Sequence, residues 1–289
     1  MSASTAASAW HRSKVELSGL LEPLGAACRE AGDRIRAIRQ AGFAIERKGD
    51  SSPVTEADRA AEGILLKALA RFAPGVPVVA EEEVAAGRVP QLADRFFLVD
   101  PLDGTKEFVR GGDDYTVNIG LIEDGQPVLG LVLAPEQGRL YAGLVGQGAY
   151  VEQRDGQRRR LRTREATTPL AVVASKSHMN AATEAYLASA APDANRLSVG
   201  SSLKFCLVAE GSADLYPRLS PTSEWDTAAG HAVLLAAGGK VDAPVGGPLR
   251  YGKPHFLNAG FVATGGWDAP LVGPYLSAVS DDPGTFSMP

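Results

Sequence analysis

Four short segments place carboxylates where the chain turns, and carboxylates grouped in this way could bind a divalent cation. The triplet EEE at 81–83 directly follows the apolar run VPVVA, and DPLDGT at 100–105 directly follows FFLV. WDT at 225–227 precedes a run of small residues, and TEAD at 55–58 opens a helical pattern. Several carboxylates that lie close together are costly unless a cation neutralises them, and oxygen ligands without His or Cys suit Mg²⁺. The segments therefore predict a magnesium site, provided that the fold brings them together.

The segment DPLDGT is the most informative of the four. Pro101 cannot donate a backbone hydrogen bond, so we expect the strand to end at Asp100 and the chain to turn there. Asp100, Asp103 and the Leu102 carbonyl could then face a common point. Gly104 would let a ligand approach the backbone closely, leaving N–H groups at a helix start that suit a phosphate.

The other three segments also have structural interpretations. A Glu triplet after a strand is often a solvated loop, and Asp226 before a small-residue helix is often an N-cap. Thr55 with Asp58 matches a capping box. DPLDGT has few purely structural explanations, so it favours a functional interpretation. If this segment binds a metal, the carboxylates of the other segments are favoured as further ligands.

Two helices and several short strands must position these segments. Apolar residues from Leu24 to Ile38 recur at helical spacing, with Pro23 expected in the first turn and Gly42 as the stop. A second helix is predicted from near Thr55 to Pro74-Gly75. Tightly spaced strands then predict an antiparallel sheet with the two helices packed on it; they are expected at 76–80, 96–99, 116–122, 128–133 and 148–151.

Beyond about residue 165 strands and helices alternate, which favours an α/β layered half. Strands are expected at 171–174, 196–199, 213–216 and 240–242, and helices at 181–189, 203–209, 227–237 and 270–279. The Arg-rich run at 154–165 is predicted to be a solvated hairpin that turns at Asp155-Gly156. An anion or nucleic-acid patch is the alternative.

The composition excludes several classes of protein. With 289 residues the chain suits one or two domains, and its net charge of −5 argues against a generic nucleic-acid binder. Its two cysteines, Cys28 and Cys206, cannot form a disulfide framework or a cysteine zinc site, and Cys206 is expected in the core. The small, polar N-terminus is interpreted as a frayed leader on a cytoplasmic protein, with peripheral association with the inner membrane left open.

Taken together, the motifs resemble the inositol monophosphatase superfamily of Mg²⁺-dependent, lithium-sensitive phosphatases. The resemblance is closest to its branch of 3′(2′),5′-bisphosphate nucleotidases, and it runs from about residue 15 to 264. The segments that carry it are KGDSSPVTEAD (48–58), VVAEEE (78–83), VDPLDGTKEF (99–108), YTVNIGLI (115–122), SKSH (175–178), VGSSLKFCLVAEGSADLYPRL (199–219), EWDTAAGHAVLLAAGG (224–239) and FLNAG (256–260).

The resemblance implies a five-layer αβαβα sandwich of the α/β class. Residues 1–165 would form an N-terminal α+β domain that carries most metal ligands, and 166–289 a C-terminal α/β domain that supplies Asp226 and the nucleotide contacts. Two Mg²⁺ ions are implied, with a third, more labile ion near Glu81 as an alternative. The implied ligands are Glu81, Asp100 and the Leu102 carbonyl for the first ion, and Asp100, Asp103 and Asp226 for the second.

The resemblance also implies roles in catalysis and substrate binding. Thr105, held by Asp58, would relay a proton from a metal-activated water that attacks phosphorus. The residues implied to contact the substrate are Glu81, Gly104, Thr105, His178, Ser201, Lys204, Arg218 and Asp226. Of these, the Gly104 and Thr105 N–H groups would hold the scissile phosphate. Ser201, Lys204 and Arg218 would contact the retained 5′-phosphate and nucleoside, and His178 would lie near the base.

Two residues depart from the usual family pattern, and one ligand assignment is ambiguous. Ala80 replaces a residue that is often Ser or Gly, and Ala259 stands where Pro is usual. The Glu triplet leaves the metal ligand ambiguous, and Glu81 is preferred because it abuts the strand.

The implied activity is removal of the 3′-phosphate of adenosine 3′,5′-bisphosphate, a by-product of sulfate assimilation, with 3′-phosphoadenylyl sulfate as a further substrate left open. The alternative within the same chemistry is an inositol or sugar-phosphate phosphatase, and a non-catalytic nucleotide or metal sensor is a third hypothesis. The expected partner is a small-molecule nucleotide, with no nucleic acid and no transmembrane segment, and a homodimer is left open.

Overall fold

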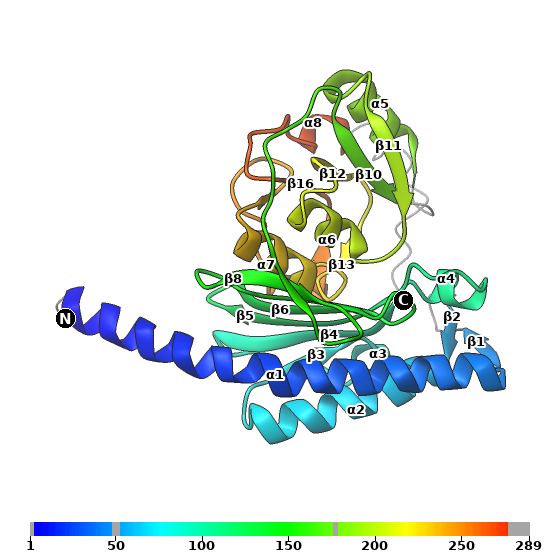
Figure 1. Cartoon of the computed structure of the whole chain (residues 1–289), viewed down its shortest axis with the longest axis vertical. Coiled ribbons are helices and arrows are strands. Elements are labelled where there is room, and N and C mark those ends of the chain that lie inside the picture. The colour runs from blue at the N-terminus through cyan, green and yellow to red at the C-terminus, as the bar shows by residue number, and fades with distance from the viewer. Residues whose placement is uncertain (1–2, 48–52, 176–178, 277–289) are drawn as a thin grey trace.

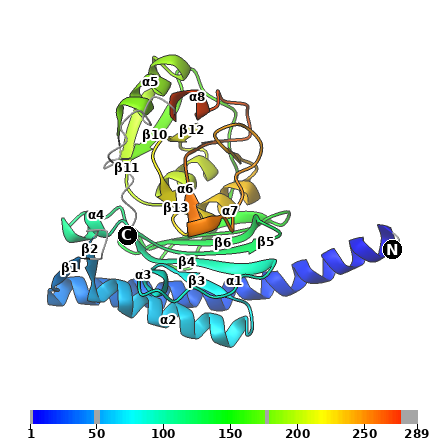
Figure 2. The same cartoon turned by 180° about the vertical axis from the view of Figure 1, so that it is seen from behind.

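Two β-sheets, each with helices on both faces, form the part of the chain that the computed structural model describes, residues 3–47, 53–175 and 179–276. Helices α1 and α2 cover the outer face of a seven-stranded sheet, and α6 and α7 lie between this sheet and a five-stranded one (Figures 1 and 2). Helices α5 and α8 cover the far face of the second sheet. The predicted five-layer αβαβα sandwich is confirmed.

The first layer consists of α1 (Ala3–Ala41) and α2 (Glu56–Phe72). The apolar stripe from Leu24 to Ile38 is buried against the sheet, and α1 ends before Gly42, whose φ is +85°. The predicted start at Pro23 is wrong, because the helix begins at Ala3 and Pro23 lies inside it. A proline removes one backbone hydrogen bond, and here the helix continues through it between segments rich in Ala and Leu.

The seven-stranded sheet follows the chain order from β3 to β9. Its strands are β3 (Val78–Ala80), β4 (Arg95–Asp103), β5 (Thr116–Glu123), β6 (Gln126–Ala134), β7 (Arg139–Leu144), β8 (Gly148–Glu152) and β9 (Arg158–Leu161). Every neighbouring pair is antiparallel except β3 and β4, which are parallel and joined through α3 (Glu81–Ala85). The mainly antiparallel sheet was predicted, whereas β7 was not.

The five-stranded sheet has the order β11-β10-β12-β16-β14. Its strands are β10 (Ala171–Ser175), β11 (Asn195–Val199), β12 (Leu215–Arg218), β14 (Lys240–Asp242) and β16 (Phe261–Thr264). The helices of this half are α5 (Ala181–Ala190), α6 (Leu203–Ala209), α7 (Ala228–Ala237) and α8 (Gly273–Leu276). The predicted alternation of strands and helices is confirmed, and β16 is an addition to it.

Short elements complete the described chain. They are β1 (Ile45–Arg47), β2 (Pro53–Thr55), α4 (Thr105–Val109), β13 (Thr222–Ser223), a 3₁₀ turn (Pro254–Phe256) and β15 (Leu257–Asn258). β1 pairs with β2, and β13 pairs with β15. None of the helices in the described ranges has an apolar stretch long enough to cross a bilayer.

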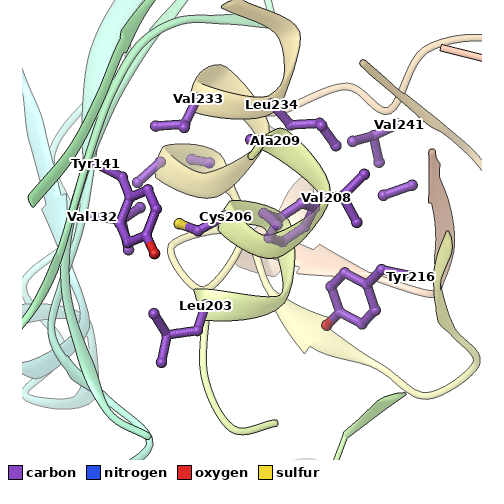
Figure 3. Packing of buried hydrophobic residues seen from close by; sticks show 14 of the residues in the cluster. Val132, Tyr141, Leu203, Cys206, Val208, Ala209, Tyr216, Val233, Leu234 and Val241 are labelled. Atoms are coloured by element: carbon purple, nitrogen blue, oxygen red, sulfur yellow. The ribbon is translucent and has the colours of Figure 1, made fainter. Parts of the chain in front are cut away.

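The middle layer is an apolar core that joins the two sheets. Figure 3 shows Cys206 of α6 among side chains from the first sheet, α6 and α7. The Cys206 thiol is fully buried, as predicted, and burial raises its pKa. His231 of α7 is also buried, 2.9 Å from the Tyr251 hydroxyl, and burial lowers its pKa to about 3. His231 is therefore a neutral packing residue at physiological pH.

A row of three glycines lets α7 lie close to the first sheet. Gly120, Gly130 and Gly143 are cross-strand partners on β5, β6 and β7. A Cβ atom at Gly120 would lie 2.7 Å from the Ala228 side chain, and one at Gly143 would lie 2.8 Å from Val233 Cα. Because real Cβ atoms do not approach so closely, the position of α7 depends on the absence of side chains along this row.

The Arg-rich segment forms the predicted hairpin. β8 and β9 pair across a turn in which Gly156 has a φ of +83°. Arg158 contacts Glu22 and Glu152 in ion pairs, and Arg164 pairs with the buried Asp214. These arginines therefore link the hairpin to other elements.

Candidate active site

A β-bulge in β4 brings Asp100 and Asp103 to the same side of the sheet. Asp100 pairs with Asn118 and Asp103 with Thr116, so two residues of β4 stand opposite one residue of β5. In a regular strand, residues three apart point to opposite faces, and the extra residue corrects this. The expectation that the strand ends at Asp100 is therefore wrong: Pro101 interrupts the pairing, and the strand resumes through Asp103.

Asp100 is buried, and its environment disfavours the charged form. Its Oδ1 accepts a hydrogen bond from the Leu102 N–H at 3.0 Å. Burial, and then the nearby charges of Glu81, Asp103 and Asp226, raise the pKa of Asp100 well above its ordinary value. This electrostatic cost is the one that a bound cation would relieve.

The Glu triplet divides its side chains between two surroundings. Glu81, the first residue of α3, lines the same cavity as Asp100. Glu83 forms an ion pair with Arg88 at 2.6 Å, and the Glu82 N–H donates to Glu62. Of the three residues, the geometry places Glu81 with the other acidic side chains.

Asp103 and Asp226 come from different halves of the chain and are each held through one carboxylate oxygen. Asp103 Oδ2 accepts from the Ser202 N–H at 2.6 Å. Asp226 Oδ2 accepts from the Thr222 hydroxyl and from the Ser223 N–H. Burial, followed by the charge of Asp103, raises the pKa of Asp226 to about 6. Asp226 is not the N-cap of α7, because Thr227 occupies that position.

Both groups of residues line one cavity of about 230 Å³. Five carboxylates line it, from Glu81, Asp100, Asp103, Glu107 and Asp226, together with Leu102, Gly104, Thr105, Ser201, Lys204 and Arg218. No three acidic, His or Cys side chains in the described ranges already converge closely enough to form a metal cage. The donor set is nevertheless all oxygen, and burial together with mutual repulsion raises the pKa values of Asp100 and Asp226. These residues fit a hard divalent cation such as Mg²⁺.

Asp58 contacts both Thr105 and the start of α2. Its Oδ2 accepts from the Thr55 N–H and the Thr55 hydroxyl, each at 2.8 Å, which completes the predicted capping box. Its Oδ1 accepts from the Thr105 hydroxyl at 3.1 Å. The structural and the functional interpretations of this segment are therefore compatible, since each uses a different oxygen of Asp58.

The two buried cations of the cavity contact backbone carbonyls. Lys204 Nζ donates to the Ser201 carbonyl at 2.6 Å and to the Val199 carbonyl at 3.3 Å, and burial lowers the pKa of Lys204 to about 8. Arg218 donates to the Ser220 and Pro221 carbonyls. The predicted base contact, His178, lies outside the described residues.

Sequence reasoning missed three polar residues that hold the ligands. Ser202 contacts Asp103, Asn118 contacts Ser202, and Thr222 contacts Asp226. Thr222 stands four residues before Asp226 and could have been noticed. Ser202 contacts Asp103, and Asn118 contacts Ser202, only because the fold brings distant segments together. Their local sequence therefore gives no signal.

Comparisons with known proteins show the family of this chain. The model of the inositol monophosphatase family matches residues 16–270. The chain is 45% identical to a 3′(2′),5′-bisphosphate nucleotidase CysQ from Salmonella typhimurium, over 85% of this chain and 99% of that protein. It is 44% identical to the Escherichia coli K12 protein of the same name, over 84% of this chain and 98% of that protein.

Solved structures include similar folds. A crystal structure of CysQ from Bacteroides thetaiotaomicron matches with a TM-score of 0.72 and 35% identity, covering 87% of this chain and 98% of that one. An inositol monophosphatase from Anabaena matches with a TM-score of 0.68 and 25% identity, covering 91% and 96%.

Proposed function

This chain belongs to the inositol monophosphatase family, and we propose that it is a Mg²⁺-dependent phosphomonoester hydrolase that removes the 3′-phosphate of adenosine 3′,5′-bisphosphate. One observation supports this most strongly: a single cavity joins Glu81, Asp100, Asp103 and Asp226 to two buried cations, Lys204 and Arg218. A substrate with two phosphates could place one at each end. Relatives of 44–45% identity are named as 3′(2′),5′-bisphosphate nucleotidases.

The family is metal-dependent, typically on magnesium, and we assign two ions to the acidic end. Glu81, Asp100 and the Leu102 carbonyl would hold one, and Asp100, Asp103 and Asp226 the other. When bound, the divalent cations stabilise the phosphoryl oxygens and activate the attacking water. A third ion near Glu81 is the alternative that a metal titration would detect.

Thr105 and Asp58 provide a route for the proton that the attacking water loses. The Thr105 hydroxyl donates to Asp58 Oδ1, so it can take a proton from water as its own hydrogen passes to Asp58. Thr55 fixes the other oxygen of Asp58, which keeps Oδ1 directed to Thr105. The Gly104 and Thr105 N–H groups would hold the phosphoryl oxygens, as the DGT motif predicts.

The cationic side chains of the cavity would recognise the retained phosphate and the nucleoside. Lys204 and Arg218 are buried cations of the same cavity, and Ser201, which also lines it, has a φ of +50°. A φ in this range is uncommon for a non-glycine residue and is enriched at functional sites. Ser201, Lys204, Arg218 and His178 therefore remain our candidates for nucleotide contacts.

A second candidate function is hydrolysis of inositol or sugar phosphates. The fold match to the Anabaena inositol monophosphatase favours it, because the same metal end could serve either substrate. The two functions differ in the part of the substrate that Lys204 and Arg218 must bind.

A substrate panel tests the proposal. We expect kcat/KM for adenosine 3′,5′-bisphosphate to exceed that for inositol 1-phosphate by at least about tenfold, a difference of ~1.4 kcal/mol. Activity should disappear with EDTA, return with Mg²⁺ and fall with Li⁺, and Asp103→Asn is the matched inactive control. Good turnover of inositol 1-phosphate without turnover of the nucleotide would favour the second candidate.

We also propose a two-domain division at 165/166. This position lies between β9, which ends the first sheet at Leu161, and β10, which begins the second at Ala171. Limited proteolysis within 162–170 that yields two fragments of the corresponding sizes would support the division.

A further inference from the structure

Ser202 lies where three elements of the site meet. It directly precedes α6, and its exposed fraction is 2%. Both its N–H and its hydroxyl contact Asp103 Oδ2, at 2.6 and 2.8 Å. The hydroxyl also lies 2.8 Å from the backbone carbonyl of Asp226.

Asn118 of β5 directs the Ser202 hydroxyl. Its Nδ2 donates to Ser202 Oγ at 3.1 Å, and the residue is fully buried. Because Asn118 donates to the oxygen, the single hydroxyl hydrogen must point elsewhere, and its acceptors are Asp103 Oδ2 and the Asp226 carbonyl. One hydroxyl hydrogen therefore faces an acceptor from each half of the chain.

Ser202 does not cap its helix in the way that a serine at this position usually does. Ser202 is the N-cap residue of α6, but its hydroxyl makes no capping hydrogen bond to that helix. The hydroxyl is directed to Asp103 and to the segment that carries Asp226. By engaging Asp103 Oδ2, Ser202 leaves Oδ1 as the oxygen available to a cation.

We propose that Ser202 is a positioning residue that fixes Asp103 relative to Asp226 and thereby sets the affinity for the divalent cation. This inference rests on the metal dependence in the proposed function. Residues that hold metal ligands typically change metal affinity or activity by ~10- to 100-fold when they are replaced. Ser202→Ala keeps the N–H contact, so we expect the lower end of this range.

The test measures Mg²⁺ binding directly, by titration calorimetry of the metal-free protein. We expect Ser202→Ala to raise the Mg²⁺ dissociation constant about tenfold. Ser202→Thr, which keeps a hydroxyl, should stay within about threefold of the parent protein. Ser212→Ala is the matched control, because the Ser212 hydroxyl also contacts a carboxylate, Glu210, but outside the site; its Mg²⁺ affinity should be unchanged.

Activity provides a second readout. At subsaturating Mg²⁺ we expect Ser202→Ala to lower the rate with little change in the KM for the nucleotide, and saturating Mg²⁺ should restore the rate. A raised KM with unchanged Mg²⁺ affinity would overturn the proposal, since Ser202 would then be a substrate contact. Unchanged Mg²⁺ affinity in a folded Ser202→Ala protein would overturn it as well.

Two further arrangements keep the outcome interpretable. If Ser202→Ala does not fold, Asn118→Ala removes the donor that directs the hydroxyl, and we expect it to weaken Mg²⁺ binding about threefold; no change would overturn the proposal. If the parent protein binds Mg²⁺ and Ser202→Ala binds it weakly, but neither hydrolyses the nucleotide, then the proposed function fails and this inference stands. If the parent hydrolyses the nucleotide and Ser202→Ala binds Mg²⁺ normally, only this inference fails.

Discussion

Asp226→Asn is expected to stabilise the metal-free protein at pH 8 while abolishing its activity. Burial and the charge of Asp103 raise the pKa of Asp226 from 3.8 to about 6. A shift of roughly 2 units corresponds to ~3 kcal/mol by which the ionised carboxylate destabilises the fold. Because this side chain borders a cavity where water screens charge, we expect about 1–2 kcal/mol. Asn keeps an oxygen for the Thr222 and Ser223 donors, so those hydrogen bonds can persist.

The sign of the pH dependence follows from the same shift. The folded state binds the Asp226 proton more tightly than the unfolded state, so wild-type stability falls as the pH rises from about 4 to about 6 and then levels off. The variant lacks this contribution. Its advantage should therefore be complete at pH 8 and smaller at pH 4.5.

Thermal unfolding in EDTA measures the effect. For a chain of this size 1–2 kcal/mol corresponds to about 2–3 °C in Tm. With Mg²⁺ added the order should reverse, because only the wild type gains stability from binding. Asp214→Asn is a control of opposite sign: burial raises the pKa of Asp214, but hydrogen bonds from Arg164 and Thr167 more than offset this and lower it overall. An Asp226→Asn Tm at or below wild type at pH 8 in EDTA, with Asp214→Asn destabilised as expected, would refute the reasoning.

Three further predictions concern the cavity. Asp58→Asn should lower kcat by roughly 10²- to 10⁴-fold at saturating Mg²⁺, and initial rates within tenfold of wild type would exclude Asp58 from the proton route. Gly104→Ala should cost about 1–3 kcal/mol in denaturant unfolding, because φ is +98° and the new Cβ would lie 3.0 Å from the Asp114 carbonyl. Gly87→Ala, also at positive φ but in open space, should cost less, and equal losses would show that the close approach is unimportant. In the wild type the KM for the nucleotide should increase above pH 8, where Lys204 loses its charge. Lys204→Met should raise the KM and abolish this increase with pH. A KM for the variant equal to that of wild type would contradict a phosphate contact.

Local sequence was sufficient where the signal and its structural result lie close together. The capping box of Thr55 and Asp58 is an example, because both residues belong to one turn. The strand end at Asp100 was mispredicted, because the rule that proline breaks pairing does not say whether the strand resumes. Whether it resumes depends on the partner strand, where Thr116 pairs with Asp103 beyond the bulge.

The site was predictable as a set of residue types but not as an arrangement. The acidic segments identify the ligands in the sequence, and the fold brings Asp226 to Asp103 across 123 positions of the chain. Ser202 contacts Asp103 from 99 positions away. Such contacts depend on how two sheets pack around α6 and α7, which no local pattern encodes.

The glycine row beneath α7 lies outside the cavity, yet it affects how wide the cavity is. Gly120 lies under the start of the helix, next to Ala228, whereas Gly143 lies under Val233, further along. A methyl group at Gly120 would lift the end of α7 that follows Asp226, and one at Gly143 would tilt the helix about that end instead. The separation of Asp226 from the carboxylates of β4 is thus adjustable from a buried row of glycines that does not line the cavity. Evolution could retune the width of the cavity for a larger or smaller substrate without changing a single residue that lines it.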